Sequence, residues 1–262
     1  MTAFFVPVGD GRFESTELTR GPWDAGAQHG GPPSALAGHV VETRAGARTD
    51  MRVTRMTVEL MRPVPIAPLN VATRTVHSGR SVEVVEVILT PDDGKPMLRA
   101  TAQRIRVADS DDDAPADEPT PQLPPPGEIE PHRFEFPFEV GYHTALETRF
   151  VRGGFLEPGS ATCWTRLTVP VVEGVPLSPL SRVLAAADSG NGISNVLDFD
   201  KYLFVNPDLT VVLHRYPDGE WVALDSRTTL GGAGIGAADT NLHDERGPIG
   251  HGLQSLFIAP RP

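Results

Sequence analysis

Hydrophobic residues recur along this chain at two spacings, and the order of the spacings predicts a helix followed by several strands, twice. The first helix is predicted to open at Gly31-Pro32-Pro33, because a proline in the first turn lacks only an N–H that has no helical partner there. The second is predicted to begin at Ser178-Pro179, with the Ser178 hydroxyl as its cap. The apolar stripes are formed by Leu36, Val40 and Val41 in the first helix and by Leu180, Val183, Leu184 and Ala187 in the second.

Extended runs rich in β-branched residues follow each helix, with turn signals such as Asp92-Asp93-Gly94 between them. A helix followed by an antiparallel meander predicts an α+β fold in which a sheet wraps around one helix. The predicted strands are 54–62, 69–77, 81–89 and 97–107 in the first half, and 210–215, 221–228, 235–243 and 250–258 in the second.

The two halves also resemble each other in sequence. The run that starts at Thr57 resembles the run that starts at Thr210, an offset of 153 residues, and Gln103 corresponds to Gln254 at an offset of 151. Matches in the same order at nearly constant offset indicate a duplicated domain. The boundary is predicted at residues 108–131, where proline and aspartate are too abundant for a packed core. The prediction is therefore an N-terminal domain over 1–107, a linker over 108–131 and a C-terminal domain over 132–262.

Composition and charge indicate which partners and which cellular location to expect. The formal net charge of −11 disfavours nucleic acid, because an acidic chain repels phosphates. Cys163 is the only cysteine, so no intrachain disulfide can form, as expected in a reducing cytoplasm. Residues 1–14 lack the pattern of a signal peptide. No apolar run approaches the roughly 20 residues of a membrane span, so we expect a cytoplasmic protein without a membrane partner.

Three polar residues stand out against apolar surroundings. Asp188 follows three alanines near the end of the second helix, where a negative charge opposes the helix dipole; it either has a function or simply faces water or caps a turn. Gln254 lies on the apolar face of a strand and must find hydrogen-bond partners, which a structural glutamine would meet on the backbone. Asn206 precedes Pro207 and is also what a plain turn would carry.

A fourth candidate is His29-Gly30-Gly31, directly before the first helix. Free N–H groups at a helix start can polarise a carbonyl, and glycines let a ligand approach the backbone; the alternative is an ordinary loop. The eight histidines show no metal-ligand spacing, so no metal site is predicted. The chain also lacks the Gly-x-Ser-x-Gly elbow of serine hydrolases.

These pieces together resemble the acyl-CoA thioesterase II-like family, whose members are double hotdog proteins. The resemblance rests on His29-Gly30-Gly31, Ala187-Asp188, residues 206–211 leading to His214-Arg215, and residues 252–256. It implies a tandem hotdog fold, two antiparallel sheets each wrapped around a central helix. It also implies hydrolysis of an acyl-CoA thioester without a cofactor.

The resemblance further implies the roles of individual residues. The family holds a water against the thioester with an Asp, a Gln and a Thr. Asp188 matches the Asp as general base, Gln254 matches the Gln, and Asn206 stands in the position of the Thr. His29, Gly30, Gly31 and Thr228 are expected to contact the substrate. Because the first half has Ala37 where the second has Asp188, one active site per chain is expected.

Two other functions stay open from the sequence. A hotdog hydratase or dehydratase acting on an acyl-CoA would need a histidine beside Asp188, and His29 could approach it only in space. A non-catalytic acyl-CoA-binding protein is the second alternative. A homodimer is expected in each case, because exposed sheet edges in hotdog proteins tend to pair.

Overall fold

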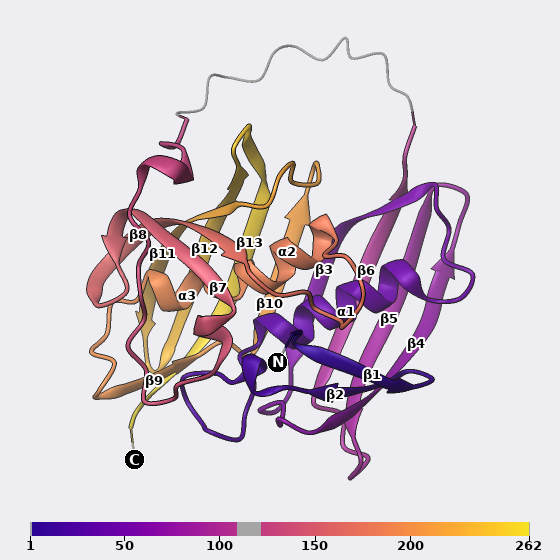
Figure 1. The fold of residues 1–262 in the computed structure, drawn as a ribbon, viewed down its shortest axis with the longest axis horizontal. Helices are drawn as coiled ribbons and strands as arrows, with labels where there is room; N and C mark the ends of the chain where they lie inside the picture. The colour runs from indigo at the N-terminus through magenta and orange to yellow at the C-terminus, as the bar shows by residue number, and fades with distance from the viewer. Residues whose placement is uncertain (1, 109–121, 262) are drawn as a thin grey trace.

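A computed structural model describes residues 2–108 and 122–261 and shows an α+β arrangement of mostly antiparallel strands (Figure 1). The helices of at least one α-helical turn are α1 (Gly31–Thr43), α2 (Pro179–Ala187) and α3 (Gly190–Ile193). The strands are β1 (Phe5–Gly9), β2 (Arg12–Ser15), β3 (Met51–Leu60), β4 (Pro68–Ser78), β5 (Val82–Pro91), β6 (Leu98–Arg106), β7 (Leu146–Gly154), β8 (Glu157–Leu167), β9 (Tyr202–Val205), β10 (Asp208–Leu213), β11 (Val222–Gly232), β12 (Ile235–Asp244) and β13 (Gly247–Pro260).

The strands form one continuous sheet in the part of the chain that is described, in the order β1-β2-β4-β5-β6-β3-β10-β13-β12-β11-β8-β7, with β9 beside β13. The sequence predicted two sheets. They are joined edge to edge because β3 and β10 pair antiparallel at the centre. This order is symmetric about the central β3–β10 pair. Going outward from the centre, β6, β5, β4, β2 and β1 of the first half correspond to β13, β12, β11, β8 and β7 of the second. The central pair places Thr57 opposite Thr210, the two residues that the repeat relates, with their hydroxyl oxygens 3.2 Å apart.

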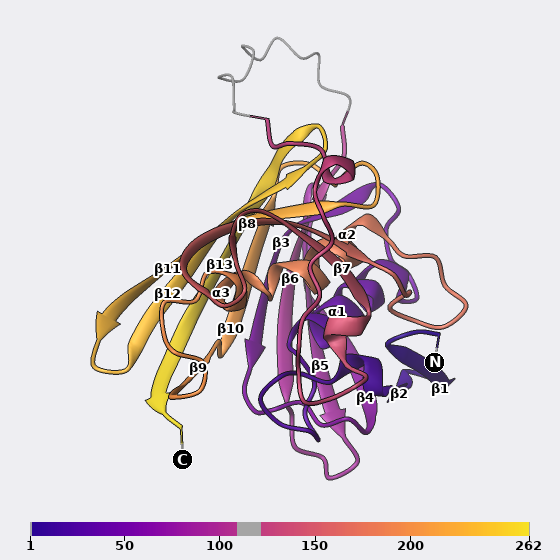
Figure 2. The same ribbon diagram turned by 60° about the vertical axis from the view of Figure 1, so that its left-hand side comes forward.

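Helices α1 and α2 run antiparallel to each other across the inner side of the curved sheet (Figure 2). Helix α1 packs on β4, β5 and β6, and α2 packs on β8, β10 and β11. Their close contact depends on two glycines. A Cβ on Gly31 would lie 2.4 Å from the carbonyl oxygen of Ala185, and a Cβ on Gly38 would lie 2.4 Å from Leu184 Cδ1. The start of α1 therefore meets the end of α2.

The predicted helices and the eight predicted strands are present with ends shifted by a few residues. The Ser178 cap is also present, since its hydroxyl accepts a hydrogen bond from Ser181 N at 3.1 Å. The prediction missed β1 and β2 before the first helix, β7 before the second, and β9, whereas the alternating run around Cys163 does lie in a strand, β8, with the thiol buried. In β1 the short run Phe5–Gly9 contains a proline and ends in a glycine, so its pattern is too brief to indicate a strand.

Most of the predicted linker, residues 109–121, lies outside the described residues. Its last part contacts the second half: Trp164 Nε1 donates a hydrogen bond to the Pro124 carbonyl at 2.8 Å, and Arg149 donates to the carbonyls of Pro126 and Ile129. Pro126 is buried. The linker and domain boundaries themselves stay predictions.

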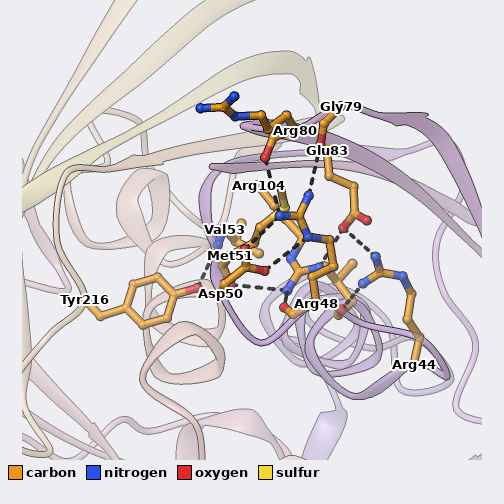
Figure 3. Close-up of polar contacts among 11 residues, drawn as sticks. Arg44, Arg48, Asp50, Met51, Val53, Gly79, Arg80, Glu83, Arg104 and Tyr216 are labelled. Carbon is orange, nitrogen blue, oxygen red and sulfur yellow. Dashed lines mark hydrogen bonds and ion pairs between the residues drawn. The ribbon is translucent and has the colours of Figure 1, made fainter. Parts of the chain in front are cut away.

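A buried ion cluster closes the end of the first half opposite the start of α1 (Figure 3). Glu83 Oε2 accepts hydrogen bonds from Arg104 Nη1 at 2.6 Å and from Arg44 Nη2 at 2.5 Å. Arg104 also donates to the carbonyls of Arg48 and Met51. Burial opposes ionisation of Glu83, but the two arginines outweigh it and lower the pKa of its carboxyl.

Candidate active site

The candidate site lies where the first turn of α1 meets the last turn of α2. Asp188 directly follows α2 and its side chain is only 3% exposed. A Cβ on Gly30 would lie 2.8 Å from Asp188 Oδ2, so the carboxylate approaches the backbone at a position that only glycine allows. The positive end of the α1 dipole thus faces a buried negative charge, which stabilises the carboxylate.

Both carboxylate oxygens of Asp188 have partners. Asn206 Nδ2 donates to Oδ1 at 2.7 Å, and His29 Nδ1 lies 3.0 Å from Oδ2. Asn206 is held in place by a second bond from Nδ2 to the Asp208 carbonyl. The three side chains come from three separate parts of the chain and meet at the Asp188 carboxylate, which is hydrogen-bonded to Asn206 and lies 3.0 Å from His29 Nδ1. This excludes the alternative that Asp188 faces water.

The imidazole of His29 is fixed from two sides. It stacks on the Tyr142 ring with centroids 4.0 Å apart, and the Tyr142 hydroxyl donates to the Ala185 carbonyl at 2.6 Å. Burial raises the pKa of Tyr142, so this residue stays neutral. His29 Nδ1 lies close to both Asp188 and Gly31 N, at 3.0 and 3.1 Å. The Gly31 N–H donates to Nδ1, so this nitrogen accepts a hydrogen bond from the start of α1 while it lies beside the Asp188 carboxylate.

Gln254 is buried directly behind Asp188. Its Nε2 donates to the Asp188 backbone carbonyl at 3.1 Å, and its Oε1 accepts from Asn191 N at 3.0 Å. The side chain therefore connects the end of α2 to the start of α3 and does not touch the Asp188 carboxylate. Gly190, the first residue of α3, lies close to Gln254 and must be a glycine. A Cβ at this position would lie 3.0 Å from Gln254 Oε1 and 2.5 Å from Thr240 Oγ1.

A cavity of about 580 Å³ opens beside this group. His29, Gly30, Asp188 and Asn206 line it, so the structure brings four of the predicted site residues to one surface. Gly31, Gln254 and Thr228 do not line it. The Thr228 hydroxyl bonds Ser194 Oγ at 2.8 Å, and its contact with the substrate stays a prediction.

Aromatic rings are a prominent part of the remaining wall. Seven of the eleven phenylalanines line the cavity, together with Trp23 and Tyr142, so aromatic side chains are concentrated here far above their 6% share of the chain. Many of these rings meet edge to face, for example Phe134 and Phe155 with centroids 5.0 Å apart. An apolar pocket with a few polar groups at one end is typical of a small-molecule site.

One side of the wall is an extended segment before β7, which we call the strap (residues 132–140). Even-numbered residues of the strap are half-buried and odd-numbered ones are exposed. Phe134, Phe136 and Phe138 consequently face the cavity, while Glu135 faces water. The strap is tied down by Arg20, which donates from Nη1 to the Val140 carbonyl at 2.9 Å and lies over the Phe138 ring.

The sequence interpretation missed the strap, Tyr142 and Asn191. The strap did carry a signal, since aromatic residues alternate with charged ones or proline from His132 onward, which is a period of two. Tyr142 and Asn191 carried none, because their partners are distant in the chain. In the described residues no cluster of three or more His, Cys, Asp and Glu side chains is arranged to hold a metal ion. None of the described helices is both long and apolar enough to cross a membrane.

Solved structures similar to this one span nearly the whole chain. A conserved protein of unknown function with a hot dog fold from Alicyclobacillus acidocaldarius is 16% identical, with 96% of this chain and 92% of that chain covered and a TM-score of 0.75. A candidate thioesterase II from Thermobifida fusca YX is 19% identical, with coverages of 99% and 98% and a TM-score of 0.77. Acyl-CoA thioesterase II TesB2 from Mycobacterium marinum is 14% identical, with coverages of 98% and 96% and a TM-score of 0.67. Identities this low establish the fold alone, which is of the hotdog type.

Family models extend the comparison from fold to family. The model of the acyl-CoA thioesterase N-terminal domain matches residues 19–105, and that of the acyl-CoA thioesterase C-terminal domain matches residues 112–258. No curated protein matches the chain. The chain belongs to the acyl-CoA thioesterase family, and the thioester hydrolase class expected from the sequence is confirmed.

Proposed function

We propose that the chain hydrolyses an acyl-CoA thioester with a water activated at the Asp188 group. The observation that carries this proposal is the buried carboxylate of Asp188, hydrogen-bonded to Asn206 and 3.0 Å from His29 Nδ1 at the polar end of an aromatic cavity. The aromatic wall would hold the acyl group, and the polar end would meet the thioester carbon. The reaction forms a free acid and CoA.

The start of α1 would supply a hydrogen-bond donor to the thioester carbonyl. Gly30 lines the cavity, and its N–H makes no hydrogen bond to a described residue. Such a first-turn donor, supported by the helix dipole, would stabilise the oxyanion that develops when water adds to the carbonyl. Asn206 would hold the Asp188 carboxylate in place, and Gln254 would fix its backbone from behind. We assign both to positioning.

The repeat supports a tandem double hotdog architecture with one site per chain. Strand order, helix placement and the Thr57–Thr210 pair are each consistent with two copies of one unit related by a local two-fold axis. The site takes its helix start from the first copy and its acid from the second. Neither copy would be complete alone, which agrees with one active site at their interface.

Release of free CoA tests the function directly. We expect the purified chain to liberate thiol from acyl-CoA substrates, followed with a thiol reagent, and the acid to appear in equal amount. A panel of aliphatic and aromatic acyl groups would identify the preferred substrate. Absence of thiol release with every member of the panel, although the acyl-CoA binds, would leave the non-catalytic binding function.

A hydratase acting on an enoyl-CoA is a second candidate, because the His29–Asp188 contact at 3.0 Å provides the histidine that this function needs. Water would then add across the double bond beside the carbonyl, and the thioester would remain. Loss of the enoyl absorbance without thiol release distinguishes this reaction from hydrolysis.

The strap supplies a specificity prediction. Phe136→Ala should raise KM by up to about tenfold with a smaller change in kcat, because one aromatic contact contributes about 0.5–1.5 kcal/mol and about 1.4 kcal/mol is tenfold in affinity. Glu135→Ala, on the outer side of the same strap, is the matched control and should leave both constants unchanged. Equal KM values for Phe136→Ala and the unaltered protein would show that the strap does not contact the acyl group.

The homodimer and the cytoplasmic location remain predictions. The outer side of the sheet carries exposed apolar residues on neighbouring strands, among them Val212 and Leu253. Burial of such a surface would favour association of two chains. Light scattering at micromolar concentration measures the mass, and a monomer there would contradict the dimer.

A further inference from the structure

We propose that the acyl group of the substrate carries an aromatic ring close to the thioester, so that the chain acts on arylacyl-CoA in preference to linear fatty acyl-CoA. This inference rests on the proposed hydrolysis and names the substrate class of the same site. Its basis is the kind of side chain that lines the cavity. Seven phenylalanines, Trp23 and Tyr142 line it, whereas three leucines do, although leucine is the more common residue in the chain.

Six of the rings that line the cavity form one connected series. The aromatic series consists of Trp23, Phe134, Phe136, Phe155, Phe199 and Phe204. Phe134 meets Phe155 edge to face with centroids 5.0 Å apart, and Phe155 continues to Phe199 at 6.0 Å. Phe199 stacks on Trp23 at 4.7 Å. A substrate ring would therefore meet both faces and edges of neighbouring rings, at the spacings that aromatic pairs prefer.

The far side of the aromatic series is supported by Arg261. Its guanidinium lies over Trp23 at 5.1 Å and over Phe199 at 4.8 Å, and Arg261 does not line the cavity. Its Nε and Nη2 are buried without a hydrogen-bond partner in the described part of the chain, so the ring faces are the groups that stabilise its charge. Rings held in this way are in place before the substrate enters. A rigid acyl ring also loses less conformational freedom on binding than a linear chain with many rotatable bonds.

The aromatic series begins beside the reacting groups. Phe204 lies two residues before Asn206, whose Nδ2 donates to Asp188 Oδ1 at 2.7 Å. At ~3.3 Å per residue of extended chain, the backbones of Phe204 and Asn206 are at most about 7 Å apart. Asn191 Nδ2 also donates to the Phe204 carbonyl. A ring attached to the thioester carbonyl through a short linker would therefore reach the series while the carbonyl lies at Asp188.

Three acyl-CoA substrates with the same number of carbon atoms test the assignment. Phenylacetyl-CoA carries an aromatic ring, cyclohexylacetyl-CoA carries a ring without π-electrons, and octanoyl-CoA carries a linear chain. We expect kcat/KM, measured by thiol release, to be about tenfold higher for phenylacetyl-CoA than for octanoyl-CoA, since aromatic pairs add affinity beyond apolar burial. Cyclohexylacetyl-CoA should lie between the two.

A substitution that removes one ring gives a second measurement. Phe155→Leu keeps an apolar side chain within the aromatic series and should lower the ratio of kcat/KM for phenylacetyl-CoA to that for octanoyl-CoA by at least about twofold. Phe150→Leu is the matched control, because it removes a ring of β7 that does not line the cavity, and it should leave this ratio unchanged. Both substrates are compared in the same variant, so a partial loss of folded protein cancels in the ratio.

Three results would overturn the inference. Octanoyl-CoA could be hydrolysed as fast as phenylacetyl-CoA, or cyclohexylacetyl-CoA could match phenylacetyl-CoA, which would show that apolar volume rather than aromaticity sets the preference. An unchanged ratio in Phe155→Leu would show that the aromatic series does not contact the acyl ring. Absence of thiol release from all three substrates would instead contradict the proposed hydrolysis. The dissociation constants of the three substrates would then still decide the class of acyl group that the cavity binds.

Discussion

Asp188→Asn is expected to lower hydrolysis of an acyl-CoA by at least ~10²-fold while the protein remains as stable as before. Asparagine keeps an oxygen that can accept from Asn206, and its amide can donate to His29 Nδ1, so the hydrogen bonds survive. The substitution removes the negative charge, so the side chain can no longer accept a proton from the attacking water. The measurement is kcat/KM by thiol release together with thermal unfolding.

Asp239→Asn provides the same chemical change at an exposed position on β12 and should leave both activity and stability unchanged. Binding of a non-hydrolysable acyl-CoA analogue to Asp188→Asn should stay near normal, because the aromatic wall is untouched. Hydrolysis at the normal rate by Asp188→Asn would contradict every mechanism that places this carboxylate at the reacting group. Lost activity accompanied by a large drop in stability would instead indicate a structural role.

The second large effect is expected at the buried ion cluster. Glu83→Gln should lower the free energy of unfolding by about 3–5 kcal/mol, since removal of one member of a buried ion pair leaves an uncompensated charge. The charge that remains is that of Arg104, which is only 3% exposed, beside Arg44 (Figure 3). Denaturant unfolding measures the change. Activity per folded molecule should be kept, because the cluster lies beyond the end of α1 that is distant from Asp188.

Glu86→Gln is a control from the same strand. Glu86 also accepts from two arginines, Arg74 and Arg99, but these are largely exposed, so the loss should be at most about 1 kcal/mol. The pH dependence gives a further check. The pKa of Glu83 is lowered on folding, so its contribution is complete above about pH 4.3, the ordinary value for glutamate, and is lost as pH falls through the lower folded pKa. Equal losses in Glu83→Gln and Glu86→Gln would contradict the special role of burial.

Local pattern accounts for most of the secondary structure of this chain. A period of two along a strand and of about 3.6 along a helix records which side of each element is apolar, and this information is present in the residues themselves. The repeat of Thr57 at Thr210 was readable for the same reason. The unusual position of Asp188 could also be recognised in the sequence, because this carboxylate follows three alanines at the end of an apolar helix. The pattern predicted an α+β fold, and the hotdog type and the thioesterase class followed from the resemblance of these residues to the acyl-CoA thioesterase II-like family.

The contacts between distant segments were decided by the tertiary structure. Pairing of β3 with β10 uses backbone N–H and C=O groups at two edges, and these groups are the same in every residue, so no side-chain pattern announces which edges meet. His29 and Asp188 come within 3.0 Å because Gly31 and Gly38 allow α1 and α2 to pack closely. The sequence indicated both residues, but only this packing shows that the carboxylate lies beside the imidazole, and that Gln254 holds the backbone behind it.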